Sequence, residues 1–395
     1  MRTTGTTAIG IRTPLIREGD NIIDIVVDSV ISYTTEDGKP LVSGDIIGVT
    51  EAVVARAQGN YATTDQIAES VRSFFPGGEV GVIFPILSRN RFSVQLKGIA
   101  RGARKLFIQL SYPADEMGNH LITPEQLYES GINPYTQSFT LEEFRAQFGS
   151  ERHVFTGVDY LELYQTIGNL APEGVTIILS NNPCEILRYT KSVLVADIHT
   201  RARTAHQLES AGATVVGLDQ ILAKPVNGSG YNEEYGLLGS NKSDEERVKL
   251  FPRNCDSFVI GLQKSIKERT GATVEVMVYG DGAFKDPVGK IWELADPVVS
   301  PAYTPGLVGV PNEIKLKKIA DTELAALSAE EADERLKNRI RTKSDSLVGK
   351  DDAEGTTPRR LTDLIGSLCD LISGSGDKGT PVVLVRGYFD NYATE

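Results

Sequence analysis

Two acidic residues near position 281 are of the type that a divalent metal ion binds. Asp281 stands between Gly280 and Gly282 at the end of a predicted strand, and Asp286 follows five residues later. Mg²⁺ and Mn²⁺ bind through oxygen, commonly one or two carboxylates together with phosphate oxygens and water. We therefore predict Asp281 as the main metal ligand and Asp286 as a second one. The alternative is that Gly-Asp-Gly is only a tight turn.

A glycine-rich segment near the carboxyl end holds the second group of candidates. Residues 373–379 read Ser-Gly-Ser-Gly-Asp-Lys-Gly, without the spacing of a Walker A motif. Consecutive backbone N–H groups in such a segment can turn inward to bind an anion, and a lysine adds positive charge beside phosphate oxygens. We predict that Gly376 and Lys378 bind phosphate and that Asp377 assists the metal. A flexible helix-to-strand connection is the alternative.

Two earlier segments offer further candidates. Residues 13–20, TPLIREGD, contain Pro14, which makes a turn rigid and leaves backbone groups free to hydrogen-bond a purine. Arg56, near the end of a predicted helix, can reach a phosphate or simply complement the helix dipole. The four histidines and three cysteines lack ligand spacing, so we expect neither a histidine metal site nor a disulfide framework.

Composition limits the classes of partner. The chain has 395 residues, which predicts two or three domains. Its net charge of −12 repels a phosphodiester backbone, so nucleic acid is not an expected partner. No apolar run approaches the roughly 20 residues of a membrane span, and the first residues lack the apolar stretch of a secretion signal. We expect a cytoplasmic protein that does not bind membranes.

Apolar strands alternate with amphipathic helices between about residues 80 and 225. Strands are predicted at residues 106–110, 175–179, 193–196 and 214–216. This alternation is typical of a parallel, doubly wound sheet, although no G-x-G-x-x-G dinucleotide fingerprint follows a strand. One helix is predicted to carry both His199 and His206.

Elements outside this region complete a mixed α/β fold. We predict a strand ending at Ile11, a helix from Ile22 capped by Asp20, strands at 46–49, 273–279 and 381–386, a helix containing Phe258, a helical pair at 320–341, a last helix at 360–372 and a long loop at 227–241. We expect an amino-terminal part of a nucleotide-binding domain (residues 1–80), an inserted doubly wound α/β domain (81–225) and a carboxyl-terminal part with the metal and glycine-rich loops (226–395).

The order of several short motifs resembles a known enzyme family. These motifs are TPLIREGD, SGDIIGVTEAVVARAQGN, YGLLGSN, ERTGATVEVMVYGDGAF and GDKGTPVVLVRG. In this order the chain resembles the coenzyme F420-0:L-glutamate ligases, the gamma-glutamyl ligases of F420 biosynthesis. The resemblance implies a ligase forming a carbon–nitrogen bond between a carboxylate acceptor and L-glutamate or another amino acid. It also implies use of GTP (or ATP) with Mg²⁺ or Mn²⁺, and a homodimer.

Carried over by position, the resemblance implies a set of nucleotide contacts. With Ser240 added beside Asn241, they are Thr13, Pro14, Leu15, Ile16, Glu51, Ala52, Arg56, Ser240 and Asn241. Together with Gly376 and Lys378 they form the predicted nucleotide site. Asp281, Arg56 and Lys378 are the predicted catalytic group, and Asp281, Asp286 and Asp377 the predicted metal ligands.

The family's metal positions are not all kept. This chain has Leu238, Gly280 and Ser375 where the family has metal-binding or acidic residues. Leucine cannot bind magnesium, so Asp281 and Asp377 would have to take over by a shift in register. Two alternatives therefore stay open. The enzyme acts on another acid, such as a folate, or the protein is a non-catalytic scaffold that binds a nucleotide.

Overall fold

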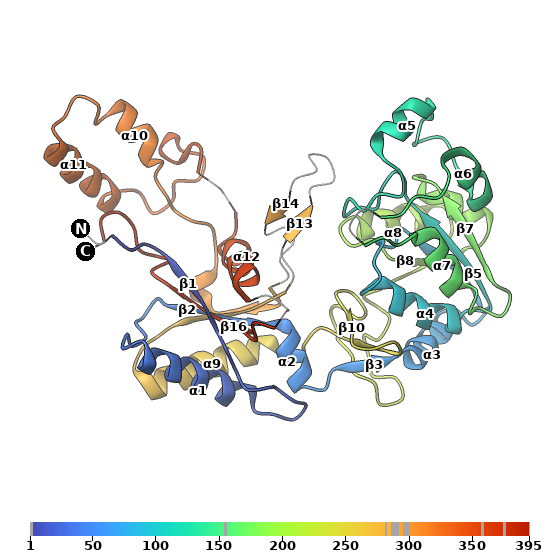
Figure 1. Cartoon of the computed structure of the whole chain (residues 1–395), viewed down its shortest axis with the longest axis horizontal. Helices are drawn as coiled ribbons and strands as arrows, with labels where there is room; N and C mark the ends of the chain where they lie inside the picture. Colours follow the sequence, from blue (N-terminus) through green and yellow to red (C-terminus); the bar gives the residue numbers. More distant parts are fainter. Residues whose placement is uncertain are drawn as a thin grey trace. The chain divides into compact units, whose positions relative to one another are not determined.

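The computed structural model divides the chain into two compact units. It describes residues 3–153, 156–280, 283–285, 292–294, 300–356, 359–373 and 377–394. The first unit consists of Met1–Val54, Asn254–Phe284 and Glu293–Glu395, and the second of Ala55–Arg253 and Lys285–Trp292. The inserted domain expected at residues 81–225 lies inside the second unit. Both units combine helices with sheets, which confirms the predicted mixed α/β class (Figure 1).

The first unit is built on a five-stranded sheet made from distant parts of the chain. Its order is β1 (Thr7–Ile11), β16 (Val382–Arg386), β2 (Ile46–Thr50), β12 (Glu275–Tyr279) and β15 (Ala302–Tyr303). β2 and β12 run parallel, whereas β16 is antiparallel to both β1 and β2. The strands predicted from apolar runs are thus confirmed, and β16 brings the carboxyl end of the chain into the centre of the sheet.

Helices cover both faces of this sheet. Figure 1 shows α1 (Ile22–Glu36) and α9 (Cys255–Thr270) on one face and α12 (Leu361–Ser373) on the other. The cap of α1 is Asn21, whose side chain accepts from the backbone N–H of Asp24. The predicted cap Asp20 is therefore wrong, because its carboxylate instead accepts from the backbone N–H of Arg17 at 2.6 Å.

Close packing under α12 explains one glycine of β2. A Cβ added to Gly48 would lie 2.6 Å from Sγ of Cys369, which is fully buried on α12. Real Cβ atoms do not approach a side chain so closely, so the position requires glycine. The remaining helices of the unit, α10 (Leu316–Thr322) and α11 (Ala329–Arg341), form the predicted pair and share a small apolar cluster with Leu347.

The second unit contains a six-stranded sheet. Its order is β6 (Phe139–Thr140), β7 (Val175–Leu179), β5 (Lys105–Leu110), β4 (Glu79–Ile83), β8 (Ser192–Val195) and β9 (Thr214–Gly217). All neighbours pair in parallel except β6 with β7. The chain winds outward from β4 in both directions, which confirms the predicted parallel, doubly wound arrangement. The strand β4 itself was not predicted.

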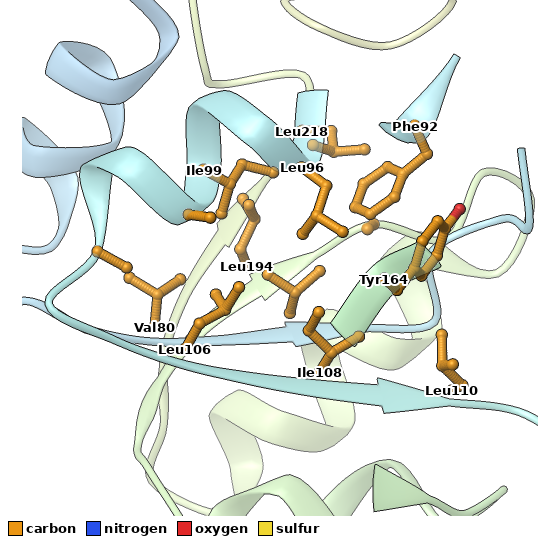
Figure 2. Close-up of a cluster of buried hydrophobic side chains, with 14 of the residues drawn as sticks. Val80, Phe92, Leu96, Ile99, Leu106, Ile108, Leu110, Tyr164, Leu194 and Leu218 are labelled. Carbon is orange, nitrogen blue, oxygen red and sulfur yellow. The ribbon is translucent and has the colours of Figure 1, made fainter. Parts of the chain in front are cut away.

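A large apolar core fills the space between this sheet and its helices. Figure 2 shows Leu96 and Ile99 of α4 (Phe92–Gly102) clustered with Leu106 and Ile108 of β5. The other helices of the unit are α2 (Glu51–Ala57, at the division between units), α3 (Thr64–Phe74), α5 (Pro124–Ser130), α6 (Leu141–Phe148), α7 (Tyr160–Gly168) and α8 (Arg201–Ser210). Because α8 begins at Arg201, the prediction that His199 and His206 share a helix is wrong.

A small three-stranded sheet completes the second unit. Its order is β10 (Asn241–Lys242), β11 (Arg247–Lys249) and β3 (Tyr61–Thr63). The segment before β10 contains no described helix or strand from residue 227 onward, as predicted for a long loop. Asn60 holds this loop, because its Oδ1 accepts from the backbone N–H of Tyr231 at 3.0 Å and its Nδ2 donates to the carbonyl of Tyr231 at 3.1 Å.

Candidate functional site at one edge of the first sheet

Four chain segments meet at one edge of the first unit's sheet. Ile11 at the end of β1 pairs with Val382 at the start of β16, and Val382 pairs with Val49 near the end of β2. At the end of β12, Tyr279 pairs with Thr50. The segments that follow β1, β2 and β12 and the segment that precedes β16 therefore all leave the sheet at the same edge. The backbone N–H of Thr50 also donates to the carbonyl of Pro381 at 3.0 Å.

This convergence concerns the two loops from which the sequence predicted a common site. Gly280 follows β12 directly, and Lys378 lies three residues before Pro381. The predicted residues Asp281, Asp286 and Gly376 lie outside the described residues. Of these two segments, the described residues Gly280 and Lys378 lie next to β12 and β16 at the same edge of the sheet.

A cavity of about 810 Å³ opens beside this edge. It is lined by residues that follow β1, by one face of α1, and by residues at the end of α12 and before β16. Among the predicted nucleotide-binding residues, the structure brings together Thr13, Pro14 and Lys378 here. The amino-terminal turn and the glycine-rich segment therefore share one hollow, although more than 360 residues separate them in the sequence.

A hydrogen bond connects the two sides of the cavity. Nε of Arg12 donates to the backbone carbonyl of Lys378 at 3.2 Å. Nearby, the hydroxyl of Thr380 donates to the carbonyl of Ser373 at 2.6 Å, which links the end of α12 to the start of β16. Both basic side chains, Arg12 and Lys378, are exposed. They present two positive charges at the sheet edge, which is a suitable arrangement for the oxygens of a phosphate.

The face of α1 contributes polar groups with their own partners. Asp28 accepts from Nη1 of Arg269 at 2.6 Å, and the hydroxyl of Ser32 donates to Glu36 at 3.2 Å. These carboxylates are thus held by neighbours within the first unit. The positive charge at the sheet-edge end of the cavity comes from Arg12 and Lys378, which makes that end the better place for an anion.

The remaining residues of the amino-terminal turn differ in what they can offer. Leu15 is 67% exposed, whereas Ile16 is only 3% exposed and belongs to the core. A buried apolar side chain has no polar atom for a ligand, so Ile16 can contribute only its backbone groups. Leu15 is free to contact an apolar surface such as a base.

The second predicted segment begins α2. Glu51 follows β2 directly, starts the helix and is 6% exposed, and Ala52 beside it is half-buried. An acidic residue in the first turn complements the positive end of the helix dipole. Arg56 lies exposed in the last turn of the same helix and belongs to the second unit. The predicted roles of these residues remain predictions.

Ser240 and Asn241 also belong to the second unit and do not line the cavity. Ser240 is fully buried, and its hydroxyl accepts from Nε2 of Gln95 at 2.9 Å. Nδ2 of Asn241 donates to the carbonyl of Gly239 at 3.4 Å. The structure gives Ser240 a packing role within its own unit.

The metal site stays a prediction. Asp377, the one predicted carboxylate ligand among the described residues, is exposed. Within the described ranges, no group of three or more His, Cys, Asp or Glu residues has the geometry to hold a metal ion. The donors expected for Mg²⁺ or Mn²⁺ include Asp281 and Asp286, which fall outside those ranges.

Sequence reasoning missed Arg12 and the polar face of α1. Arg12 follows the last residue of β1 and precedes the Thr13–Pro14 turn, so a basic residue at the end of a strand was the available signal. On α1, Ser29, Ser32, Tyr33 and Glu36 line the cavity. Their spacing of three, four and seven residues marks one helix face, which lies beside the buried stripe of Val26, Val27 and Val30.

The fold and the cavity define a class of two-unit α/β protein with a ligand-sized cavity, positively charged at one end, at the edge of a mixed sheet. No described helix is long and apolar enough to cross a membrane. The family described as F420-0:Gamma-glutamyl ligase matches residues 10–387, nearly the whole chain. The protein belongs to this family, and membership indicates a gamma-glutamyl ligase. No curated protein matches the chain.

Proposed function

We propose that this protein is a nucleotide- and metal-dependent ligase that joins a carboxylate to the amino group of L-glutamate or another amino acid. Family membership supports the ligase class. The observation that carries the nucleotide part is the cavity where Thr13 and Pro14 face the same hollow as Lys378. The co-substrate is GTP or ATP, and Mg²⁺ or Mn²⁺ is the metal.

Arg12 and Lys378 are the described residues best placed to hold phosphate oxygens. The hydrogen bond from Arg12 to the Lys378 carbonyl fixes the backbone of the glycine-rich segment. No described residue accepts a hydrogen bond from Nζ of Lys378, so this ammonium group is available for a ligand. Arg56 stays a predicted phosphate contact, and Asp281, with Asp286 or Asp377, would bind the metal, which would neutralise charge on the transferred phosphoryl group.

The proposed reaction has two steps, phosphoryl transfer to the acid and then amide formation. A carboxylate oxygen of the acceptor attacks the terminal phosphorus, the bond to the bridging oxygen breaks, and the nucleoside diphosphate leaves. The amine of the amino acid then attacks the acyl carbon of the acyl phosphate, inorganic phosphate leaves, and the nitrogen loses a proton to give the amide. Positioning and charge stabilisation supply most of the rate enhancement in such transfers.

A second proposal keeps this chemistry but changes the acid. The second unit has a complete doubly wound sheet and core of its own, which provides room for recognition of a different acceptor. A folate-type acid is one such acceptor. The third hypothesis is a non-catalytic scaffold that binds a nucleotide. It is motivated by Leu238 and Ser375, which stand where the family has metal-binding or acidic residues.

The test is turnover by the purified full-length protein with Mg²⁺ or Mn²⁺. We expect release of phosphate from GTP or ATP only when both a carboxylate acceptor and glutamate are present, with a new amide in the products. A panel of acceptors with labelled glutamate distinguishes the F420-type acid from a folate. Stoichiometric nucleotide binding without turnover across the panel would replace the ligase with the scaffold. A protein that neither binds nor hydrolyses a nucleotide would contradict both the ligase and the scaffold hypotheses.

A further inference from the structure

A second cavity of about 890 Å³ lies at the opposite end of the same sheet. It is lined by the first residues of β1, by the segment between α1 and β2, and by the residues that follow β16. Asp45 precedes β2, and Arg386 ends β16. The candidate nucleotide site lies where β2 ends and β16 begins, so the length of these strands separates the two sites. We call this second hollow the Asp45 cavity.

A buried ion pair forms part of the wall of the Asp45 cavity. Nε of Arg386 lies 3.3 Å from Oδ2 of Asp45, and the two side chains are 14% and 1% exposed. Oδ2 also accepts from the backbone N–H of Val42 at 3.0 Å. One oxygen of the carboxylate thus holds both the arginine and the preceding turn.

The other oxygen of Asp45 has no such partner. Among the described residues, none donates a hydrogen bond to the buried Oδ1. A buried carboxylate oxygen without a donor is costly, and such exceptions require an explanation. Burial is the largest influence on this group and raises the pKa of Asp45, while the pairing with Arg386 opposes the rise. A ligand that brings a donor to Oδ1 would remove this cost.

The arginine is already committed to the protein. Nη1 of Arg386 donates to the carbonyl of Lys39 at 3.2 Å, and Nη2 donates to the carbonyl of Pro40. With Nε directed to Asp45, each of the three nitrogens has an acceptor. The guanidinium is therefore not presented as a binding group for an anion.

The remaining charges and the rim favour a cation. The charged lining residues are three carboxylates and two cations, namely Asp37, Asp45, Asp390, Lys39 and Arg386, and the phenol of Tyr33 also lines the cavity. Lys39 lies 3.8 Å from Asp37 with its side chain 74% exposed, so it points largely to solvent. Phe389 and Val42 also line the cavity and are 45% and 54% exposed, which leaves an apolar rim open. Aromatic faces attract ammonium groups, and apolar rims take alkyl chains.

We propose that the Asp45 cavity binds a primary ammonium group on a short apolar stem, with the ammonium donating to Oδ1 of Asp45 and the stem lying against Phe389. This ligand differs in charge from a nucleotide, and the site needs none of the residues assigned to the ligase reaction. The proposal for the Asp45 cavity and the proposed ligase function can therefore be confirmed or contradicted independently of each other. The primary ammonium is chosen over a quaternary one because Oδ1 requires an N–H donor.

The experiment measures binding of n-butylammonium to the full-length protein by ligand-observed NMR. Tetramethylammonium, which has no N–H, and butyrate, which has the opposite charge, are the comparison probes. We expect n-butylammonium to bind, tetramethylammonium to bind at least about tenfold more weakly, and butyrate not to bind. Equal binding of the two cations, or no binding of n-butylammonium, would overturn the proposal.

Variants locate the binding. Asp45→Asn removes the charge and is expected to weaken n-butylammonium binding at least tenfold. Phe389→Ala, at the exposed rim, keeps the Asp45–Arg386 ion pair and is expected to weaken binding several-fold. This variant tests the site if Asp45→Asn does not fold. Glu268→Gln removes a negative charge on α9, where its side chain is 65% exposed, and is the matched control. Unchanged binding by both the Asp45 and the Phe389 variants would contradict the assignment.

Discussion

The two units differ at the sheet edge where their parallel strands end. In the first unit, the loops at this edge carry exposed cations, Arg12 and Lys378, beside an open cavity. In the second unit, the corresponding loops are tied together by carboxylates: Asp115 is buried, and Glu116 accepts from the backbone N–H groups of Ile198 and His199. The backbone N–H groups bound by these two carboxylates therefore already have acceptors within the protein. The first edge keeps its positive groups available, which is what a ligand site requires.

Removing the Asp115 side chain should cause the largest loss of stability among the substitutions that test this difference between the units. Its carboxylate accepts from the backbone N–H groups of Leu87, Met117 and Asn119 and from Nδ2 of Asn119, at 2.7–3.0 Å. Asp115→Ala leaves these donors without their acceptor, which we expect to cost at least about 3 kcal/mol of unfolding free energy. Denaturant unfolding measures this. Nucleotide affinity should not change, and a loss of affinity at unchanged stability would mean that the second edge takes part in binding.

The same residue predicts a pH dependence of stability. Burial raises the pKa of Asp115 to about 6, although its hydrogen bonds oppose the rise. Between pH 4 and 6 the unfolded chain loses this proton while the folded chain keeps it, so the contribution of Asp115 to stability falls as pH rises and is constant above about 6. The difference between the pKa of the folded and the unfolded chain corresponds to a fall of up to about 3 kcal/mol. Unfolding of the wild type and of Asp115→Asn should differ in slope across this window, and parallel curves would show that burial does not raise the pKa of Asp115.

A smaller effect is expected in the first unit, within the sheet that carries the site. Gly48→Ala places a methyl group 2.6 Å from Sγ of Cys369. Overpacking of this kind costs about 1–3 kcal/mol. In a double-mutant cycle, Cys369→Ala should recover part of the loss, because it removes the atom that clashes. Strict additivity of the two substitutions would contradict the close packing of α12 on β2.

The parallel sheet of the second unit was largely predictable from its sequence, because most of its strands are short runs rich in apolar residues. Four of its parallel strands were predicted this way. β4 was missed because Gly81 interrupts the run, and glycine weakens a strand prediction. The structure supplies the reason for the glycine: an added Cβ would lie 2.9 Å from side-chain atoms of both Ile186 and Thr190.

The candidate site was predictable only in part. Lys378 was predicted from its glycine-rich surroundings, and the Thr13–Pro14 turn from Pro14 and from the family resemblance. Arg12 was missed because its significance lies in a hydrogen bond to Lys378, 366 residues away in the sequence. No local period or spacing records such a contact, since it depends on β1 pairing with β16. The cap of α1 was misplaced by one residue for a local reason, because Asp20 and Asn21 both have capping side chains.

The most direct test of the central claim is the equilibrium affinity of the first unit's cavity for a nucleoside triphosphate in the presence of Mg²⁺. Arg12→Gln and Lys378→Met each remove one positive charge at the sheet edge, and Lys264→Met removes one from α9, where the side chain is 74% exposed. Calorimetry of the full-length proteins should show affinity lowered about tenfold or more by each of the first two variants, as expected for loss of a charge-assisted phosphate contact, and unchanged by the third. Equal affinities in all four proteins would contradict a phosphate site between Arg12 and Lys378.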